Sequence, residues 1–378
     1  MRLSIAGAAW PRDASSQSIW DGHRRQQLGE ESSFEVNVLV TGGNGLLGRH
    51  LLPELQARGG NVRVLALAEE DTSWLKEQNV EVYVGDVRDP STLKSPMRGV
   101  DTVFHLAGMI GLWRSLDDYH SVNVQGTENI ALAALEAGVR RMVHVSSWTV
   151  YGMGLREPAR EDAPHRPFAE PYGVTKARSE KVIRRLVSSR GLPAVIVRPD
   201  TFFGPGDRLH YTRLADRLKA GKGLVIGSGS NTLPFVYVSD AARGLILASQ
   251  AREAKGQAYN IASDHPFTQE QMLDAIAEAV GAPAPRLHVP FHLMYGGAAF
   301  VEMMSSVLIP TRQPLVTRLG VLVFGANNPH SIEKAQLELG YQPTVPIAEG
   351  IKMTAAWYSG QPVEGQARTG LKAVETKA

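Results

Sequence analysis

Tyr172 and Lys176 stand four residues apart in a segment, 172–187, whose pattern predicts a helix. At this spacing two side chains share one face of a helix. A tyrosine phenol has a pKa near ~10 and is a weak base at neutral pH, but a neighbouring lysine ammonium favours the phenolate. The pair could therefore exchange a proton with a substrate hydroxyl or carbonyl. Ser147, just after a predicted strand at 142–145, could hydrogen-bond the same oxygen, although a Tyr/Lys pair alone is common on helix surfaces.

A glycine-rich turn near the amino end could hold a phosphate-bearing cofactor. Residues 36–40 predict a strand, residues 46–55 predict a helix, and between them lie Gly42-Gly43-Asn44-Gly45-Leu46-Leu47-Gly48. Gly42 permits a tight turn, Gly45 lets the backbone approach a pyrophosphate, and Gly48 lets the helix pack closely on the strand. The free N–H groups at the helix start would face the anion. The alternative is an ordinary glycine-rich turn, because the spacing is Gly-x-x-Gly-x-x-Gly.

The residues after the second predicted strand bear on the choice between NAD and NADP. Glu69, Glu70 and Asp71 follow a strand at 62–67, where an acidic side chain would hold the adenosine ribose hydroxyls of NAD. No Arg or Lys stands at that strand end, since Arg63 lies inside the strand. We therefore expect NAD, with Glu69 at the ribose. NADP stays open, and a solvated acidic loop is the alternative interpretation.

Strands that alternate with helices predict the fold. Further strands are expected at 80–85, 102–106 and 194–197, with a helix at 121–137. Such alternation predicts a parallel sheet covered on both faces, with ligands at the carboxyl ends of the strands. We expect an α/β protein: a Rossmann-type doubly wound parallel sheet with a smaller, mixed α/β C-terminal substrate lobe. Later in the chain, residues 221–229 predict a turn and hairpin, and Ser239-Asp240 and Thr268 are expected to cap helices.

The same pattern predicts the domain boundaries. Residues 34–204 are expected to form the NAD-binding Rossmann domain, to which 235–262 return. Residues 205–234 and 263–358 would form the substrate lobe. Residues 1–33 lack apolar periodicity and are expected to be a disordered extension, and 359–378 a loose tail.

The composition excludes several classes of function. The 378 residues carry 40 Lys+Arg against 38 Asp+Glu, so a net charge of +2 gives no global case for nucleic-acid binding. The chain has no cysteine, which excludes thiolate metal sites and suits a cytoplasmic location, and we expect no metal. The best apolar stretch, 291–310, is interrupted by His292 and Glu302, so no spanning helix is expected. A peripheral membrane contact and a homodimer stay open.

The motifs above occur with others in the order found in one enzyme family. They are the glycine turn 42–48, Asp86-Val87, His105-Leu106-Ala107-Gly108, Asn123-Val124-Gln125-Gly126-Thr127, Ser146-Ser147 with Val150-Tyr151-Gly152, and Tyr172 with Lys176. Over about residues 36–358 the chain resembles an extended short-chain dehydrogenase/reductase, of the NAD-dependent epimerase/dehydratase superfamily. The resemblance implies a Rossmann fold, an NAD(P) cofactor and hydride transfer.

The resemblance also implies a role for each matching residue. Tyr172 would be the acid/base, Ser147 would orient the reacting oxygen, Lys176 would also bind the nicotinamide ribose, and Asn123 would support a proton-relay water. A helix N-cap is the alternative for Asn123, and strand-end packing is the alternative for some of the cofactor residues. His105 and His144 are expected to be core histidines. The expected cofactor-binding residues are Gly42, Gly43, Asn44, Gly45, Leu46, Leu47, Gly48, Glu69, Asp86, Val87, Leu106, Ala107, Gly108, Ser146, Tyr172, Lys176 and Pro199.

Two departures and several further likenesses indicate the branch of the family. Nucleotide-sugar epimerases and dehydratases usually carry an asparagine where this chain has Thr201, and an Arg-x-Gly-Asp element where it has residues 324–330. Residues 198–207, 235–242, 339–343 and 349–358 instead resemble the 3β-hydroxysteroid dehydrogenase branch. A pocket for a bulky apolar ligand could be lined by aromatic and methionine side chains, although some of these would be core residues. The candidates are Trp113, Trp148, Phe202, Phe203, Phe291, Met294, Tyr295, Phe300, Met303 and Met304.

These observations predict an oxidoreductase that interconverts a secondary alcohol and a ketone on a bulky, apolar, sterol-like or long-chain substrate by the Ser/Tyr/Lys mechanism. A nucleotide-sugar epimerase or dehydratase with tightly bound NAD is the first alternative. A non-catalytic NAD(P)-sensing regulator is the second, although such a sensor has no need of Ser147, Tyr172 and Lys176 together.

Overall fold

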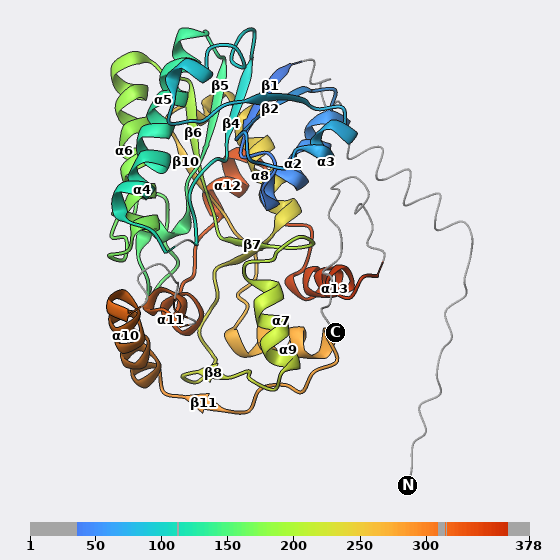
Figure 1. The fold of residues 1–378 in the computed structure, drawn as a ribbon, viewed down its shortest axis with the longest axis vertical. Helices are drawn as coiled ribbons and strands as arrows, with labels where there is room; N and C mark the ends of the chain where they lie inside the picture. Colours follow the sequence, from blue (N-terminus) through green and yellow to red (C-terminus); the bar gives the residue numbers. More distant parts are fainter. Residues whose placement is uncertain (1–35, 112, 309–313, 315, 362–378) are drawn as a thin grey trace, which may run out of the picture.

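The computed structural model describes residues 36–111, 113–308, 314 and 316–361. The predictions for residues 1–33 and for most of the tail at 359–378 therefore lie outside the described residues, as does the end of the apolar stretch at 309–310. Figure 1 shows a domain built on a sheet above a smaller lobe of short strands and helices.

A seven-stranded sheet forms the upper domain, in the order β10-β6-β5-β4-β1-β2-β3, with every neighbouring pair parallel. The order runs one way from β1 through β2 to β3 and the other way from β4 onward, so a crevice opens where β1 and β4 part. This confirms the predicted doubly wound parallel sheet. The strands are β1 (Asn37–Thr41), β2 (Asn61–Ala66), β3 (Glu81–Val84), β4 (Thr102–His105), β5 (Arg141–Val145), β6 (Ala194–Pro199) and β10 (Ala258–Ile261).

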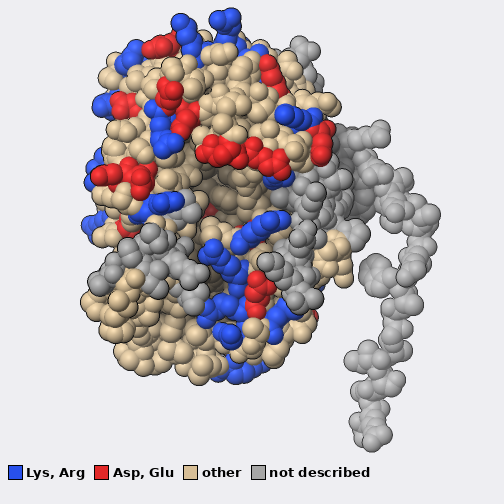
Figure 2. Space-filling model, in the orientation of Figure 1, with Lys and Arg blue, Asp and Glu red and all other residues tan. Residues whose placement is uncertain are grey.

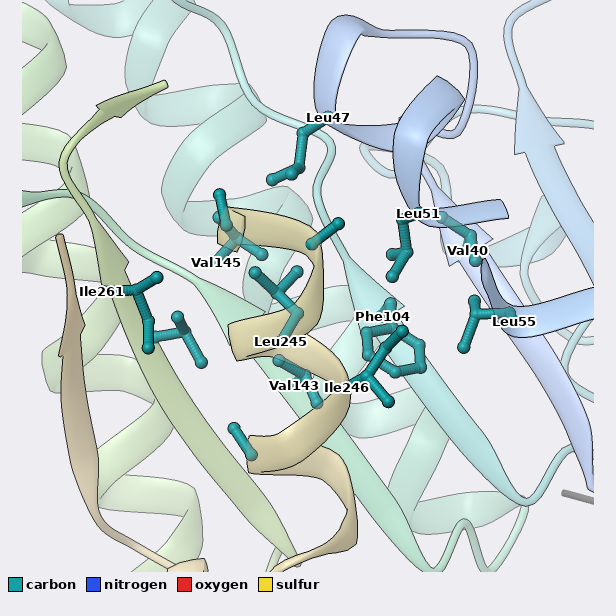
Figure 3. Close-up of a cluster of buried hydrophobic side chains, with 14 of the residues drawn as sticks. Val40, Leu47, Leu51, Leu55, Phe104, Val143, Val145, Leu245, Ile246 and Ile261 are labelled. Carbon is teal, nitrogen blue, oxygen red and sulfur yellow. The ribbon is translucent and has the colours of Figure 1, made fainter. Parts of the chain in front are cut away.

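Helices cover both faces of this sheet, which is why the central strands are apolar on both sides. One face packs on α2 (Leu46–Ala57), α8 (Val238–Gln250) and α12 (Glu333–Leu339). Figure 3 shows Leu51 of α2 and Leu245 of α8 meeting Phe104 and Val143 of the sheet. The other face packs on α5 (Gly126–Glu136) and α6 (Pro171–Arg190) through residues such as Ile130 and Ile183. The smaller elements of this domain are α3 (Ser73–Glu77), η1 (Pro90–Thr92), η3 (Trp148–Tyr151) and η4 (Arg252–Ala254).

The helix expected at 121–137 is longer and less regular than its sequence predicts. It starts with α4 (Leu116–His120), where Ser115 and Asp118 form a capping box, and continues through a π-helical turn, η2 (Ser121–Gln125), into α5. Asn123 therefore lies inside a continuous helix, and the N-cap alternative for it was wrong. A π-helical turn often marks a functional site, because it shifts the side chains that follow.

The lower lobe has its own core, which includes Phe203, Tyr211, Phe235 and Trp357. Two parallel strand pairs, β7 (Thr201–Phe203) with β9 (Phe235–Tyr237) and β8 (Val225–Ile226) with β11 (His288–Val289), hold it together. The hairpin predicted at 221–229 is thus wrong, because β8 pairs with a strand about sixty residues later. The helices of the lobe are α7 (Tyr211–Lys219), α9 (Gln269–Ala279), α10 (Phe291–Leu308), α11 (Arg318–Gly325) and α13 (Ile347–Tyr358).

One of the two predicted helix caps is present. Thr268 and Gln271 form a capping box at the start of α9, as expected. The cap at Ser239-Asp240 is wrong, since α8 starts at Val238 without a side-chain cap. Asp240 instead accepts hydrogen bonds from Thr344 and Val345, so that its carboxylate ties α8 to the segment before α13. Within the described ranges, no helix combines the length and the apolar content that crossing a bilayer requires.

Candidate active site

One buried face of α6 carries Tyr172, Lys176 and Glu180, each one turn after the last. Pro171 and Glu170 start this helix: the Glu170 carboxylate accepts hydrogen bonds from the backbone N–H groups of Tyr172 and Gly173. The helix therefore begins immediately before Tyr172, which fixes the direction of the phenol. The partners of all three side chains lie at the carboxyl ends of β5 and β6: Lys176 donates to Val145 O, Glu180 binds Ser146 and Arg198, and Tyr172 is hydrogen-bonded to Ser147.

Ser147 lies at the end of β5 and caps the short helix η3. Its hydroxyl oxygen accepts hydrogen bonds from Thr149 N, at 3.2 Å, and from Thr149 Oγ1, at 3.0 Å. The proton of Ser147 is thus directed away from Thr149, and its hydrogen bond to Tyr172 lowers the pKa of that phenol. Burial has the larger, opposite effect and raises the pKa of Tyr172 to about 12. Tyr172 is therefore a protonated phenol at neutral pH.

Lys176 is a buried cation close to that phenol. Its ammonium donates to Val145 O at 2.8 Å and lies 6.0 Å from the centre of the Tyr172 ring. Burial lowers the pKa of Lys176 to about 8, and the Glu180 carboxylate opposes part of that shift. Lys176 keeps its proton at neutral pH and so faces Tyr172 as a positive charge.

Asn123 joins the catalytic helix to the loop after β4. Its Oδ1 accepts from Met109 N at 2.7 Å, and its Nδ2 donates to Met109 O and to Thr175 Oγ1 of α6. A Cβ at Gly108 would stand 3.2 Å from both Asn123 Oδ1 and Lys176 Nζ, so glycine leaves the space that these two groups use. Both N–H groups of the Asn123 amide and its oxygen are thus engaged in positioning contacts.

The glycine turn has the geometry of a phosphate cradle. Gly42 has φ +71°, and a Cβ there would meet Ala107 N at 2.8 Å, while a Cβ at Gly48 would meet Gly43 O at 2.3 Å. At Gly45 a Cβ would stand 3.3 Å from Gly42 O, a close contact that a small shift of this neighbour would relieve. No side chain caps the first turn of α2, which leaves its N–H groups available to an anion. Leu47 is buried in the core, and Asn44 holds the turn by donating to Asp71 O.

The start of α2 carries a cation that was not among the expected cofactor residues. Arg49, the residue after Gly48, donates to Asn44 and stacks 4.6 Å over the Trp74 ring. Burial lowers the pKa of Arg49, and the nearby Asp71 carboxylate opposes that shift. Glu69 is exposed at this end of the cleft. The sequence signal for Arg49 was its place in the first turn of α2, directly after the glycine turn.

The other expected cofactor residues end the strands of the sheet on the same side. The backbone N–H groups of Leu106 and Ala107 donate to Thr41, and Pro199 is buried at the end of β6. Asp86 forms an ion pair with Arg88, whose hydrogen bond lowers the pKa of Asp86. Val87 packs against α5, where a Cβ at Gly126 would stand 2.6 Å from Val87 Cγ2. Figure 2 shows the surface hollowed between an acidic upper rim and a basic lower rim.

A buried ion pair behind the site was also missed. Arg198 of β6 binds the Glu180 carboxylate through Nε at 2.8 Å and Nη2 at 2.7 Å, and both side chains have 0% exposure. Ser146 Oγ donates to Glu180 Oε1 at 2.6 Å, so the Ser146 proton is used there. Arg198 also donates to the Tyr151 hydroxyl. The sequence signal was the spacing of Glu180 from Lys176, one further turn along the same face.

The remaining predicted residues divide between core and surface. His105 and His144 are buried and stacked, and burial lowers the pKa of both, as expected for core histidines. Trp148 and Phe203 are core as well. The pocket-lining role considered for Phe300 and Met303 is wrong, since these side chains are 59% and 55% exposed on the outer face of α10. Phe291, at the start of α10, does line an open cavity of about 640 Å³.

Comparisons with known proteins agree with this geometry. The model of the NAD dependent epimerase/dehydratase family matches residues 38–262. The chain is 33% identical over 334 residues to 2-alkyl-3-oxoalkanoate reductase of Stenotrophomonas maltophilia, covering 85% of this chain and 99% of the relative. It is 32% identical over 366 residues to 3beta-hydroxysteroid-dehydrogenase/decarboxylase isoform 1 of Arabidopsis thaliana, covering 90% and 83%.

A solved structure extends the likeness to the three-dimensional fold. The UDP-glucose 4-epimerase of Thermus thermophilus, in complex with NAD, matches with a TM-score of 0.68 at 27% identity, covering 84% of this chain and 97% of that one. The sheet order, the glycine turn and the helix with Tyr172 and Lys176 thus all belong to one fold that this chain shares with its relatives. The chain belongs to the NAD dependent epimerase/dehydratase family and is an enzyme of the extended short-chain dehydrogenase/reductase type.

Proposed function

We propose that this enzyme interconverts a secondary alcohol and a ketone on a bulky, mainly apolar substrate, with NAD as the cofactor. The observation that carries the proposal is the buried Tyr172 phenol, which receives a hydrogen bond from Ser147 and has the Lys176 ammonium one turn away. The two relatives support the substrate class, since one is named for an oxoalkanoate and the other for a hydroxysteroid. An NAD(P)-sensing regulator without activity is disfavoured, because it gains nothing from this set.

The chain's own residues would move the proton. In the reducing direction the Tyr172 phenol donates its proton to the carbonyl oxygen, which Ser147 also hydrogen-bonds. Lys176 stabilises the phenolate that remains, through its positive charge. NAD(H), when bound, supplies or accepts the hydride at the carbon. In the oxidising direction the same groups act in reverse. Tyr172 must then first lose its proton, and burial disfavours the phenolate that this produces.

The residues around the cleft would hold the cofactor. We propose that the turn from Gly42 to Gly48 and the first turn of α2 bind the pyrophosphate, with Glu69 at the adenosine ribose and Asp86 and Val87 at the adenine. Leu106, Ala107, Gly108, Ser146 and Pro199 would surround the nicotinamide side. The proposed domains remain 34–204 with 235–262 for the cofactor, and 205–234 with 263–358 for the substrate. We also propose a cytoplasmic location, which the absence of cysteine supports.

The two positions where nucleotide-sugar enzymes usually hold the diphosphate carry no cation in this chain. Thr201 accepts a hydrogen bond from Trp148 Nε1 at 3.1 Å. The side chains of Asn327 and Asn328, in the stretch 324–330, are engaged by backbone groups of Leu155, Thr232, Gly154 and others. None of these residues offers a positive charge, and two phosphates need fixed cationic or donor groups.

Calorimetry on the NAD-loaded enzyme separates the two functions. We expect a sterol-like ketone or a long-chain ketone to bind with micromolar affinity, since burying a few hundred Å² of apolar surface contributes about 25 cal/mol per Å² before the costs of association. UDP and dTDP should give no heat. Low-micromolar binding of UDP or dTDP without binding of the ketones would overturn the proposal in favour of the epimerase or dehydratase.

We further propose that the outer face of α10 contacts a lipid surface peripherally. This face exposes large apolar side chains without exposed carboxylates: between residues 281 and 308 the only carboxylate is Glu302, which turns inward to pair with Arg318. The exposed Arg286 flanks the face and would favour anionic lipid headgroups. The exposed apolar residues of α10 are Leu293, Phe300, Val301, Met303, Met304 and Leu308, and Leu287 is exposed just before β11.

Vesicle flotation distinguishes this contact from a homodimer. The wild-type enzyme should float with phosphatidylglycerol vesicles, and Leu293→Ser with Phe300→Ser should abolish flotation. Leu337→Ser is the matched control, because Leu337 is 79% exposed on α12, away from this face. If instead the enzyme sediments as a dimer that the two α10 substitutions dissociate, and does not float, the face binds a second copy rather than lipid.

A further inference from the structure

The open cavity of about 640 Å³ lies between the segment after η3 and the helices α10 and α11. One wall is formed by Leu155 and Arg156. They belong to the segment that follows η3, the short helix capped by Ser147. The opposite wall comes from α10 and α11, which pack against each other, and contains Phe291 and Leu322. The size is that of a pocket for a drug-sized ligand, typically about 300–1,000 Å³.

Both walls are connected to the catalytic groups. Gly152, which leads into the first wall, donates from its backbone N–H to Thr149 O, beside Ser147. At the other wall, Arg318 begins α11 and places its guanidinium 6.0 Å from the Phe168 ring, in the segment that leads to Tyr172. The first wall thus continues the chain that carries Ser147, and the helix of the second wall contacts the segment that leads to Tyr172.

The polar side chains that line the cavity differ in whether they already have hydrogen-bond or ion-pair partners. Asn327 has its amide engaged, because it donates to Leu155 O and accepts from Thr232 N. Arg156 is the one ionisable side chain among the described residues that line the cavity, and it is exposed. Among the residues that the structure describes, no carboxylate forms an ion pair with Arg156, and the adjacent Glu157 does not line the cavity. The lining is thus apolar apart from one available cation.

We propose that this cavity binds an apolar substrate that bears a carboxylate, and that Arg156 pairs with that carboxylate. The inference deepens the proposed function: the apolar body would lie on Phe291 and Leu322 while the carboxylate, at the mouth, fixes which carbon faces Tyr172. Arg156 is then a specificity-determining residue. An arginine suits this role because its guanidinium can make two parallel hydrogen bonds to one carboxylate.

The test uses binding of a fluorescent acid, cis-parinaric acid, and of its methyl ester, to the full chain loaded with NAD. Arg156→Gln should weaken binding of the acid by roughly 10–100-fold, the range for a lost hydrogen bond to a charged group, and leave the ester unchanged. Arg156→Lys should restore part of the preference for the acid. Arg160→Gln is the matched control, since Arg160 lies four residues away, outside the cavity, and pairs with Glu333.

Equal affinity of the wild-type enzyme for acid and ester, or an equal loss of both in Arg156→Gln, would overturn the inference. Circular dichroism of each variant checks the fold, and Arg156→Lys carries the test if Arg156→Gln does not fold. Turnover is measured separately with a long-chain ketone and a 3-oxo acid. Reduction of the ketone with no acid preference defeats only the role of Arg156, whereas an acid preference without any NADH oxidation defeats only the proposed reaction.

Discussion

At the scale of single residues, the site combines a phenol that holds its proton more firmly than a tyrosine in water with a lysine that holds its own proton less firmly than a lysine in water. Burial moves the pKa of Tyr172 up to about 12 and the pKa of Lys176 down to about 8. Both shifts come from loss of water around the charged form. The phenol is therefore ready to donate at neutral pH, and its conjugate base depends on the charge of Lys176.

Tyr172→Phe removes the proton donor while keeping the ring. We expect turnover to fall by roughly 10²–10⁴-fold, the range for a lost general acid/base, with NADH binding nearly unchanged. Steady-state kinetics and a NADH titration measure the two effects. Turnover within a few-fold of the wild type would remove Tyr172 from the mechanism.

The pH profile of ketone reduction should report Lys176. Below its pKa of about 8 the ammonium is charged and supports the phenolate, so the rate should be steady there and decline as pH rises through that value. Lys176→Arg keeps a positive charge to higher pH and should move the decline upward, although at a lower rate. A profile of the wild type that stays flat to pH 10 would show that the charge of Lys176 is not needed.

The choice of cofactor also belongs to this scale. We expect NADH to bind more tightly than NADPH, because Glu69 is proposed to hold the adenosine ribose and Arg49 is engaged by Asn44, with Asp71 nearby. Tryptophan quenching can follow both titrations, since Trp74 contacts Arg49. Glu69→Ala should narrow the difference, and tighter binding of NADPH by the wild type would mean that Arg49 reads a 2′-phosphate.

At the scale of elements, the π-helical turn η2 positions the site. It turns Asn123 toward both the loop after β4 and α6, so that one amide bridges Met109 and Thr175. Asn123 is 1% exposed, and its loss would leave the half-buried backbone groups of Met109 without this partner. The side chain therefore joins the cofactor loop to the helix that carries Tyr172 and Lys176.

Asn123→Ala should lower the free energy of unfolding by about 1–3 kcal/mol, the cost of leaving such groups unsatisfied, and should raise the KM for NADH. Urea unfolding and steady-state kinetics give the two values. Gln125→Ala, on the exposed side of the same turn, is the control and should change neither. Unchanged stability and KM in Asn123→Ala would contradict the bridging role.

At the scale of the whole molecule, the Glu180–Arg198 pair joins α6, β6 and the segment that contains Tyr151. The pair lies behind the site and orients Ser146, while its carboxylate supports the charge of Lys176. Two charges with 0% exposure are costly to separate, because the remaining one has no water. This network makes the site and the sheet one structural unit.

Glu180→Gln should reduce the free energy of unfolding by about 3–5 kcal/mol, since it leaves the Arg198 charge buried without its partner. The double variant Glu180→Gln with Arg198→Met removes both charges. Its loss of unfolding free energy should be smaller than the sum of the losses in the two single variants. The control is Glu128→Gln, which breaks an exposed ion pair with Arg185 and should cost at most about 1 kcal/mol. A Glu180→Gln effect equal to that control would contradict the network's role.

The sequence by itself determined the sheet, the glycine turn and the spacing of Tyr172 and Lys176. These depend on local rules: short apolar runs that alternate with helices, glycines where a Cβ would collide, and side chains one helical turn apart. The cap at Thr268 was predicted for the same reason. Each of these signals lies within a few neighbouring residues, so no knowledge of the rest of the chain was needed.

Only the tertiary structure decided which distant residues meet. Glu180 and Arg198 are 18 residues apart, β8 pairs with a strand about sixty residues later, and the cavity wall at Arg156 faces helices beyond residue 290. The exposed face of α10 was read as pocket lining, because an apolar helix gives the same pattern whether its partner is ligand, protein core or lipid. Burial likewise set the pKa values of Tyr172 and Lys176, and burial is a property of the packed molecule, not of the residue.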